Sequence, residues 1–329
     1  MRAIQISELG GPDALREVDL PEPEASHMLT PGEGVLIDVE AAGVSFPEVL
    51  QTRGEYQFKP PLPFAPGGEV SGVVTQVGEG VRHLKIGDKV FALTGHGGFA
   101  EDVVADASKT LPMPPGMDFV TAASMMYTYG TSYHALKDRA MLHEGETLLV
   151  LGAAGGVGLA AVQMGVLAGA KVIAAASSEQ KLAVCREMGV AATINYSTED
   201  LKERLKEITG GKGVDVIYDP VGDKYTEPAL RSIAWKGRYL VVGFAAGEIP
   251  KIPLNLALLK GCQIIGVFWG QFATLEPMNS MQNFKELLEM FLDGKLKQHI
   301  HKLYSLKTAP QALQDMIDRK VVGKAVVVI

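Results

Sequence analysis

Only two cysteines, Cys185 and Cys262, occur among the 329 residues, and they lie far apart in the chain. So few thiols exclude a small disulfide-stapled secreted fold and a zinc site that needs several thiolates. The first residues, MRAIQISELGG, alternate as a strand does and lack the apolar core of an export signal. We therefore expect a cytoplasmic protein.

An excess of basic residues is also missing. Lys and Arg number 31 against 38 Asp and Glu, which gives a formal net charge of −7, and no basic run occurs. Nucleic acids and anionic membranes attract proteins through clustered positive charge. We expect neither of them as a main partner.

Long uninterrupted apolar runs are scarce. Residues 147–170 carry no charge over 24 positions, which is long enough to span a bilayer, but six glycines interrupt the stretch. Four of these glycines fall within Gly152–Gly158. The pattern instead predicts a buried strand, a tight turn and a buried helix from about Val157 to Leu167.

Two patterns divide the chain. Up to about residue 115, β-branched runs bounded by Gly and Pro predict strands at 35–44, 69–78, 88–93 and 99–106, and the Pro-dense segment 59–66 predicts an extended loop. After Asp118, apolar strands alternate with amphipathic helices such as 177–189 and 198–210. The six expected strands are 147–152, 171–176, 192–196, 214–219, 238–243 and 263–269. This alternation predicts an α/β domain with a doubly wound parallel sheet. The tail predicts helices near 283–292 and 309–320 and a last strand at 325–329.

The sharpest motif follows the strand at 147–152 and opens a helix. Gly155 would let a backbone approach a pyrophosphate closely, and Gly158 would let the helix pack on the strand. The helix N-terminus would then offer N–H groups to the anion. The alternative is a Gly-rich turn without a ligand. The candidate cofactor-binding residues here are Ala153, Ala154, Gly155, Gly156, Val157 and Gly158.

The next strand bears on the choice of nucleotide. NAD-binding sites place an acidic residue at its end, whereas this strand ends at Ala176 and is followed by Ser177, Ser178 and Lys181. Hydroxyls and an ammonium suit a 2′-phosphate, so we predict NADPH over NADH. The alternative is that Lys181 is only a solvated helix residue.

Several motifs together resemble the zinc-free quinone oxidoreductase (zeta-crystallin-like) branch of the medium-chain dehydrogenase/reductase superfamily. They are AAGVSFPEVL (41–50), PGGEVSGVV (66–74), IGDKVFAL (86–93), GGFAE (97–101), GAAGGVG (152–158), YDPVG (218–222) and GKAVVVI (323–329). The resemblance implies a β-rich GroES-like catalytic domain at 1–125 and 267–329, a Rossmann domain at 126–266, and an active site in the cleft between them. It also suggests a homodimer formed through the sixth Rossmann strand.

The resemblance also bears on metal binding. Zinc-dependent relatives carry a metal-binding Cys where this chain has Ser45 and a His where it has Gly68, and their third ligand falls near Tyr127. Ser and Gly do not supply the N and S donors that zinc needs. His299 and His301 lack other plausible ligands nearby, so we read them as exposed strand histidines. The protein is predicted to be metal-free.

Without a Lewis acid, alcohol oxidation is disfavoured, because a metal is what stabilises an alkoxide. A quinone or an α,β-unsaturated carbonyl spreads the charge through its own conjugation. We therefore expect hydride transfer from NADPH to a small-molecule quinone or enone. The alternatives are an enoyl-thioester or 2-alkenal reductase on the same scaffold and a non-catalytic NADPH-binding protein.

The remaining candidate residues come from the resemblance. Tyr56 matches a substrate-cleft tyrosine that donates a proton in related enoyl reductases, although a rim aromatic is an equal alternative. Ser45 stands where Asn is common, and Thr131 resembles a nicotinamide-ribose contact. Tyr196 and Arg319 would join Lys181 around the 2′-phosphate. Four residues follow the last two parallel strands, where the family binds nicotinamide, although the aromatic ones suit a core role better: Gly243, Phe244, Phe268 and Trp269.

Overall fold

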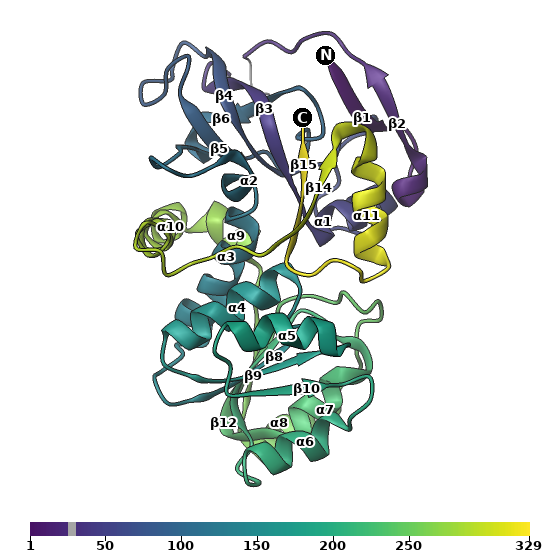
Figure 1. The fold of residues 1–329 in the computed structure, drawn as a ribbon, viewed down its shortest axis with the longest axis vertical. Helices are drawn as coiled ribbons and strands as arrows, with labels where there is room; N and C mark the ends of the chain where they lie inside the picture. The colour runs from purple at the N-terminus through teal and green to yellow at the C-terminus, as the bar shows by residue number, and fades with distance from the viewer. Residues whose placement is uncertain (26–30) are drawn as a thin grey trace. The chain divides into compact units, whose positions relative to one another are not determined.

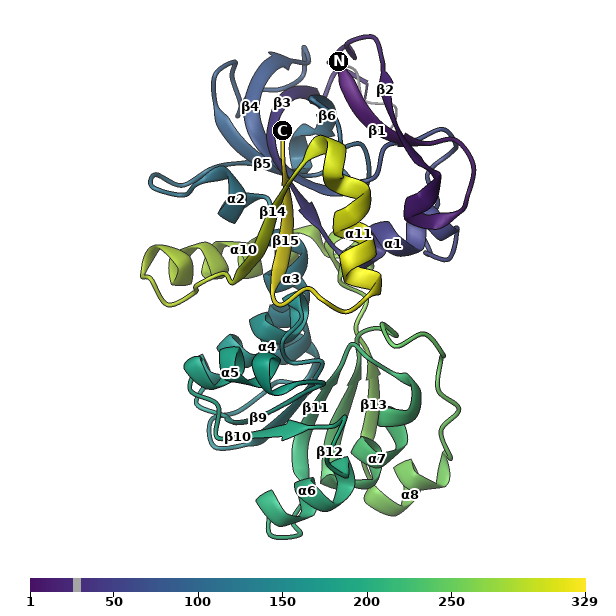
Figure 2. The same ribbon diagram turned by 45° about the vertical axis from the view of Figure 1, so that its right-hand side comes forward.

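A computed structural model describes residues 1–25 and 31–329 of the chain (Figures 1 and 2). These residues form two compact units. The first comprises Met1–Tyr127 and Gln298–Ile329, and the second comprises Thr128–Lys297. The expected Rossmann domain ended at residue 266, whereas residues 267–297 pack with the second unit.

The first unit is built on a mixed sheet with the strand order β14-β15-β3-β4-β5-β7, and β6 pairs with β3 off this path. Strand β3 is buried along nearly its whole length, and only Asp38 and Glu40 are exposed. The predicted strands are confirmed within a few residues. The bounds are β3 (Gly34–Val44), β4 (Glu69–Val77), β5 (Lys89–Leu93), β6 (Asp102–Asp106), β7 (Thr110–Pro112), β14 (Ile300–Ser305) and β15 (Lys324–Val328).

A separate antiparallel pair, β1 (Arg2–Ile6) and β2 (Leu15–Asp19), completes the β structure of this unit. The Pro-dense segment 59–66 is a loop, as predicted, with bends at Leu62 and Pro63 and one isolated bridge between Phe64 and Ile6. Among its described residues, three α-helices lie wholly within the unit: α1 (Phe46–Arg53), α2 (Phe119–Ala122) and α11 (Ala309–Ile317). Helix α11 packs against α1 and β15.

The second unit contains a six-stranded sheet in the order β10-β9-β8-β11-β12-β13, in which every pair is parallel. Sequential strands run outward from β8 in both directions, so the strand order reverses between β8 and β11. This is the doubly wound arrangement that the sequence predicted. The bounds are β8 (Thr147–Leu151), β9 (Lys171–Ala176), β10 (Ala192–Asn195), β11 (Val214–Asp219), β12 (Ile233–Val241) and β13 (Gln263–Gly266).

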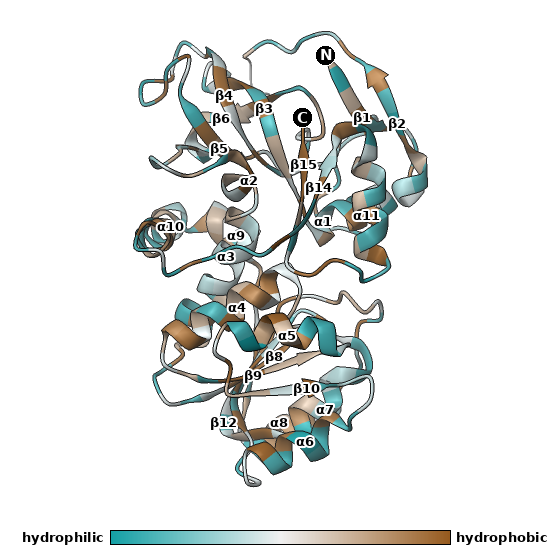
Figure 3. Ribbon diagram, in the orientation of Figure 1, coloured by the Kyte–Doolittle hydropathy of each residue, from teal (hydrophilic) through white to brown (hydrophobic). Residues whose placement is uncertain are grey.

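The helices of this unit follow their amphipathic patterns. The exposed side chains of α5 and α6 give these helices hydrophilic stretches (Figure 3), whereas α4 is buried over most of its length. The bounds are α3 (Met126–Tyr133, which crosses the unit boundary), a π-helix (His134–Arg139), α4 (Gly156–Leu167), α5 (Glu179–Glu187), α6 (Leu201–Ile208), α7 (Thr226–Arg231), α8 (Asn255–Lys260), α9 (Trp269–Leu275) and α10 (Pro277–Leu292).

Burial explains the uncharged stretch 147–170. Strand β8 lies at the centre of the sheet, and α4 packs on β8 and β9, so neither element presents a face to water. Among the described residues, no helix is both long and apolar enough to cross a membrane. Several boundaries differ from the expected ones, among them the start of β12, which lies at Ile233 instead of residue 238. The apolar run 263–269 leaves the sheet after Gly266, and α10 begins at Pro277 instead of residue 283 because proline suits the first helical turn.

Candidate functional site

The loop between β8 and α4 has the form of a phosphate-binding turn. Gly152 adopts a left-handed φ of 58°, and Gly155 is the N-cap residue of α4. A Cβ on Gly158 would overlap the carbonyl oxygen of Gly152, so close packing of helix on strand requires this glycine. A Cβ on Gly155 would meet only that same oxygen, at an ordinary 3.5 Å. The packing of the protein therefore explains Gly158 but leaves Gly155 unexplained.

Two further loops converge on this turn, both from strands on the other side of the strand-order reversal. Val221, after β11, lies close enough to Gly152 that a Cβ on the glycine would meet its methyl carbon at 2.7 Å. Phe244, after β12, lies equally close to Gly222, at 2.8 Å from the Cβ position. The N–H of Gly243 donates to the carbonyl of Asp219 over 3.3 Å. The structure thus brings the loops at 152–158, 219–222 and 242–245 to the carboxyl edge of the sheet, where ligands of such folds bind.

Asp219 organises this edge, and sequence reasoning did not single it out. The side chain is 3% exposed, and its Oδ1 accepts from the N–H groups of Val221 and Gly222, both at 2.8 Å. Its Oδ2 accepts from the hydroxyls of Thr226, at 3.1 Å, and Tyr239. The sequence did contain a signal for it, an acidic residue at the end of an apolar strand. The sequence analysis used this YDPVG motif only as part of the family resemblance.

The residues predicted around a 2′-phosphate fall into both units, and those of the second unit come together after β9 and β10. Ser178 caps α5, and the Nζ of Lys181 lies 3.4 Å from the Oγ of Ser177. Tyr196 donates its N–H to the carbonyl of Ala176, and its ring lies 4.4 Å from that of Tyr225. Arg319 belongs to the first unit, where it is exposed after α11 with a φ of 58°.

Helix α3 contacts the phosphate-binding turn directly. The hydroxyl of Ser132, next to Thr131, donates to the carbonyl of Val157 over 2.8 Å. The ring of Trp269 packs so closely on α3 that a Cβ on Gly130 would lie 2.7 Å from it. Trp269 is 7% exposed, whereas the neighbouring Phe268 is 50% exposed. A core role therefore fits Trp269, and only Phe268 has a free face for a ligand.

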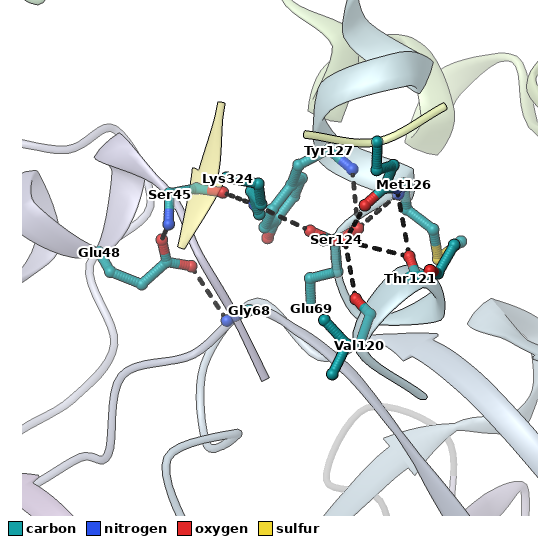
Figure 4. Close-up of polar contacts among 11 residues, drawn as sticks. Ser45, Glu48, Gly68, Glu69, Val120, Thr121, Ser124, Met126, Tyr127 and Lys324 are labelled. Atoms are coloured by element: carbon teal, nitrogen blue, oxygen red, sulfur yellow. Dashed lines mark hydrogen bonds and ion pairs between the residues drawn. The ribbon is translucent and has the colours of Figure 1, made fainter. Parts of the chain in front are cut away.

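A buried polar cluster occupies the first unit (Figure 4). Lys324, on β15, donates through Nζ to the Oγ of Ser45 and to Oε2 of Glu69, the latter over 3.2 Å. Oε1 of Glu69 accepts from the N–H groups of Met126 and Tyr127. Both Glu69 and Lys324 are buried. This ion pair joins two strands, β4 and β15, to the start of α1 at Ser45 and the start of α3.

Glu48 lies beside this pair on α1. Its Oε2 accepts from the N–H of Ser45 at 2.8 Å, and its Oε1 accepts from the N–H of Gly68 at 3.1 Å. Burial raises the pKa of Glu48 to about 7, although Lys324 and the backbone donors act in the opposite direction. Burial and then Glu48 raise the pKa of Tyr56. The raised pKa keeps the Tyr56 hydroxyl protonated at neutral pH, so it can donate a hydrogen bond.

Comparison with known proteins places these features in a family. Residues 31–115 match the alcohol dehydrogenase GroES-like domain, and residues 156–291 match the zinc-binding dehydrogenase family. A quinone oxidoreductase-like protein 2 homolog of Nematostella vectensis is 39% identical over 99% of this chain and 88% of its own length. Quinone oxidoreductase of Rattus norvegicus is 36% identical over 96% of this chain and 94% of its own. The chain belongs to the quinone oxidoreductase family.

The fold of the family agrees over the full length. The structure of Escherichia coli quinone oxidoreductase complexed with NADPH has a TM-score of 0.91 and 29% identity, with complete coverage of both chains. The GroES-like and Rossmann-type architecture and a nicotinamide cofactor are thereby established for this oxidoreductase. The turn leaves room for that cofactor at Gly155, because a Cβ there would meet only the carbonyl oxygen of Gly152, at 3.5 Å.

The residues that the resemblance matches to zinc ligands make other contacts in this structure. A Cβ on Gly68 would overlap the hydroxyl of Tyr127, so no side chain fits there unless the tyrosine moves. Ser45 accepts from the Lys324 ammonium. His301 is exposed on β14, and His299 is partly buried just before that strand.

Sequence reasoning did not identify Glu48, Glu69 and Lys324 as site residues. The available signals were charged residues inside otherwise apolar motifs, namely Glu69 in PGGEVSGVV and Lys324 in GKAVVVI. A charged residue in a buried strand needs a partner, which the sequence alone does not locate.

We expect Glu48 to make stability depend on pH. Its carboxyl binds a proton more tightly in the folded chain, with a pKa of about 7, than in the unfolded chain, where 4.5 applies. Its contribution is therefore complete below about pH 4.5 and is lost as the pH rises through 7, at up to about 1.4 kcal/mol per pH unit. Denaturant unfolding from pH 4.5 to 7.5 should show a shallower fall for Glu48→Gln than for the wild type. The exposed control Glu79→Gln should keep the wild-type slope, and parallel curves for the wild type and Glu48→Gln would contradict the assignment.

Proposed function

We propose that the protein transfers a hydride from NADPH to a quinone or a similarly conjugated carbonyl without a metal ion. The observation that carries the proposal is the Ser45–Lys324 pair, a hydroxyl held by an ammonium at a position where zinc-dependent relatives carry a metal ligand. The bound cofactor supplies the hydride from its nicotinamide C4. The hydroxyls of Ser45 and Tyr56 serve as hydrogen-bond donors to the acceptor oxygen, and Thr131 contacts the nicotinamide ribose.

The cofactor preference rests on the end of β9. Ala176 carries no carboxylate to repel a 2′-phosphate, and Ser177 and Lys181 lie together beside it. Tyr196 flanks the same edge of the sheet. We assign the 2′-phosphate of NADPH to these residues, with its pyrophosphate at Gly155–Gly158. The presence of NADPH in the related Escherichia coli structure supports this assignment.

Initial rates of cofactor oxidation test the proposal. We expect a simple para-quinone to be reduced faster than a 2-alkenal at matched concentration, and NADPH to give a higher kcat/KM than NADH. A preference for the alkenal would assign the enzyme to C=C reduction. No turnover with either acceptor, despite NADPH binding, would favour a thioester substrate or a non-catalytic role.

Metal independence is proposed from the chemistry of the donors. An ammonium donates hydrogen bonds and offers no lone pair, and the Tyr127 hydroxyl takes the space beside Gly68. Full activity after dialysis against a chelator, with less than stoichiometric zinc by elemental analysis, is the expected result. Stoichiometric zinc that is needed for turnover would contradict it.

We also propose a homodimer. Strand β13 is an edge strand, and the surface beside it carries exposed apolar side chains on three elements. Trp235 is 68% exposed, Leu258 79% and Ile264 37%. A second copy that pairs at this edge would cover both the open strand and these side chains. Sedimentation equilibrium should give twice the 35.1 kDa mass of the chain.

The two free thiols, Cys185 and Cys262, suit the cytoplasm that we propose for the protein.

A further inference from the structure

Lys324 is an unusual residue for the interior of a sheet. It is 5% exposed on β15, and its Nζ donates to Ser45 Oγ and Glu69 Oε2. Room for it comes from Gly43 on the neighbouring strand β3. A Cβ at that position would overlap the carbonyl oxygen of Ala123, and it would also lie 2.9 Å from Oε2 of Glu69 and 3.2 Å from Cε of Lys324. The glycine therefore leaves room for the Ala123 carbonyl first and for the Glu69–Lys324 pair beside it.

The contacts of Ser45 define what its hydroxyl is able to do. A hydroxyl has two lone pairs and one proton. The lone pairs of Oγ face two donors, the ammonium of Lys324 and the backbone N–H of Glu48 in the capping box at the start of α1. Within the part of the chain that the structure describes, no hydrogen bond donated by this hydroxyl is found. Its proton is thus left for a group outside the protein.

The Lys324 ammonium makes the Ser45 hydroxyl a stronger hydrogen-bond donor. A lysine ammonium has no lone pair, so its role toward Ser45 is fixed as donor. Charge-assisted hydrogen bonds are stronger than neutral ones, and a chain of them polarises each member in a low-dielectric interior. Glu69 holds the ammonium in place and is itself fixed by the N–H groups of Met126 and Tyr127.

We propose that Lys324 is a positioning residue that turns Ser45 into the hydrogen-bond donor to the carbonyl oxygen of the acceptor. The inference rests on the proposed quinone reduction. As the hydride arrives, negative charge grows on that oxygen, and a polarised hydroxyl stabilises the growing charge more than the ground-state carbonyl. Lys324 therefore affects kcat through Ser45 without touching the acceptor.

A double-mutant cycle tests the action through Ser45. Lys324→Met is made together with Glu69→Gln, so that the buried ion pair is removed as a unit and no unpaired charge is left inside the fold. Ser45→Ala alone should lower kcat for a para-quinone by about 10²-fold, the loss typical of one oxyanion donor. Lys324→Met with Glu69→Gln should lower kcat about tenfold when Ser45 is present and leave it unchanged when Ser45→Ala is also present.

Controls separate this role from a structural one. The exposed Lys320→Met variant removes a lysine from the same unit and should keep the wild-type kcat. The affinity for NADPH, whose proposed site lies in the second unit, should stay constant in every variant. If Lys324→Met does not fold, Lys324→Gln replaces it, because its amide still donates to Ser45, and it should lose less activity than Ser45→Ala.

The outcomes are distinct. Equal losses from Lys324→Met with and without Ser45→Ala would overturn the inference, since a structural defect does not depend on the hydroxyl. Loss of NADPH affinity in parallel with kcat would overturn it as well. Failure of the proposed function would already be evident in the wild type, because no quinone would then support the oxidation of NADPH.

Discussion

Replacing Gly158 by alanine is expected to destabilise the protein by about 1–3 kcal/mol, the usual range for an overpacked interior. The added Cβ would overlap the carbonyl oxygen of Gly152, which is backbone and has little freedom to move. Alanine is the better helix former by up to about 1 kcal/mol, so the steric overlap has to outweigh that gain. Denaturant unfolding of the cofactor-free protein measures the difference.

Gly155→Ala is the matched variant, and its expected effect is different. The φ of −80° and ψ of 171° at this position suit alanine, and the new Cβ would lie in ordinary contact at 3.5 Å. Stability should therefore stay within about 0.5 kcal/mol of the wild type. The methyl group would instead stand where the pyrophosphate approaches, so we expect the Kd for NADPH to rise at least tenfold.

The pair of variants separates packing from ligand binding within one turn. Fluorescence titration with NADPH supplies the affinity, and unfolding curves supply the stability. Unchanged NADPH affinity in Gly155→Ala would mean that the turn is only a structural feature. A stability loss equal to that of Gly158→Ala would show that the two glycines serve the same purpose.

Local patterns in the sequence predicted the second unit well. The signals for β8, the turn and α4 lie within a single stretch of about 20 residues, and the chemistry of a tight turn selects the same residues in any context. Ser178 and Lys181 likewise lie at one helix start, where the side chain of Ser178 accepts from the N–H of Lys181. Boundaries failed where an apolar run continued past the end of a strand, as at Trp269, because apolarity alone does not distinguish a strand from a buried helix.

Local sequence patterns could not predict the polar cluster of the first unit. Lys324 meets Ser45 across 279 residues of sequence and Glu69 across 255. Only the pairing of β15 with β3, and of β3 with β4, brings these side chains together. Arg319 is a different case, because the resemblance that suggested it as a phosphate ligand did not indicate that the first unit carries it.

Asp219→Ala is expected to cost about 3–5 kcal/mol, more than a typical substitution, because it would leave several buried donors without an acceptor. The carboxylate accepts from two backbone N–H groups and two hydroxyls, and all four contacts end on the loop that follows β11 or on the elements beside it. Because this loop contacts the phosphate-binding turn through Val221 and Gly152, NADPH affinity should fall together with stability.

Two milder variants, Asp219→Asn and Tyr239→Phe, show how much of that loss of stability comes from individual hydrogen bonds. The amide oxygen of asparagine can still accept from the N–H groups of Val221 and Gly222, while its NH2 group faces hydroxyls that can rotate to accept. We therefore expect a cost of about 1–2 kcal/mol, and about 1 kcal/mol for Tyr239→Phe, which removes a single donor. Unfolding curves should rank the variants in the order Ala, Asn, Phe by loss of stability. If asparagine proves as damaging as alanine, the negative charge of Asp219 is what stabilises this edge of the sheet, and the hydrogen-bond geometry alone is insufficient.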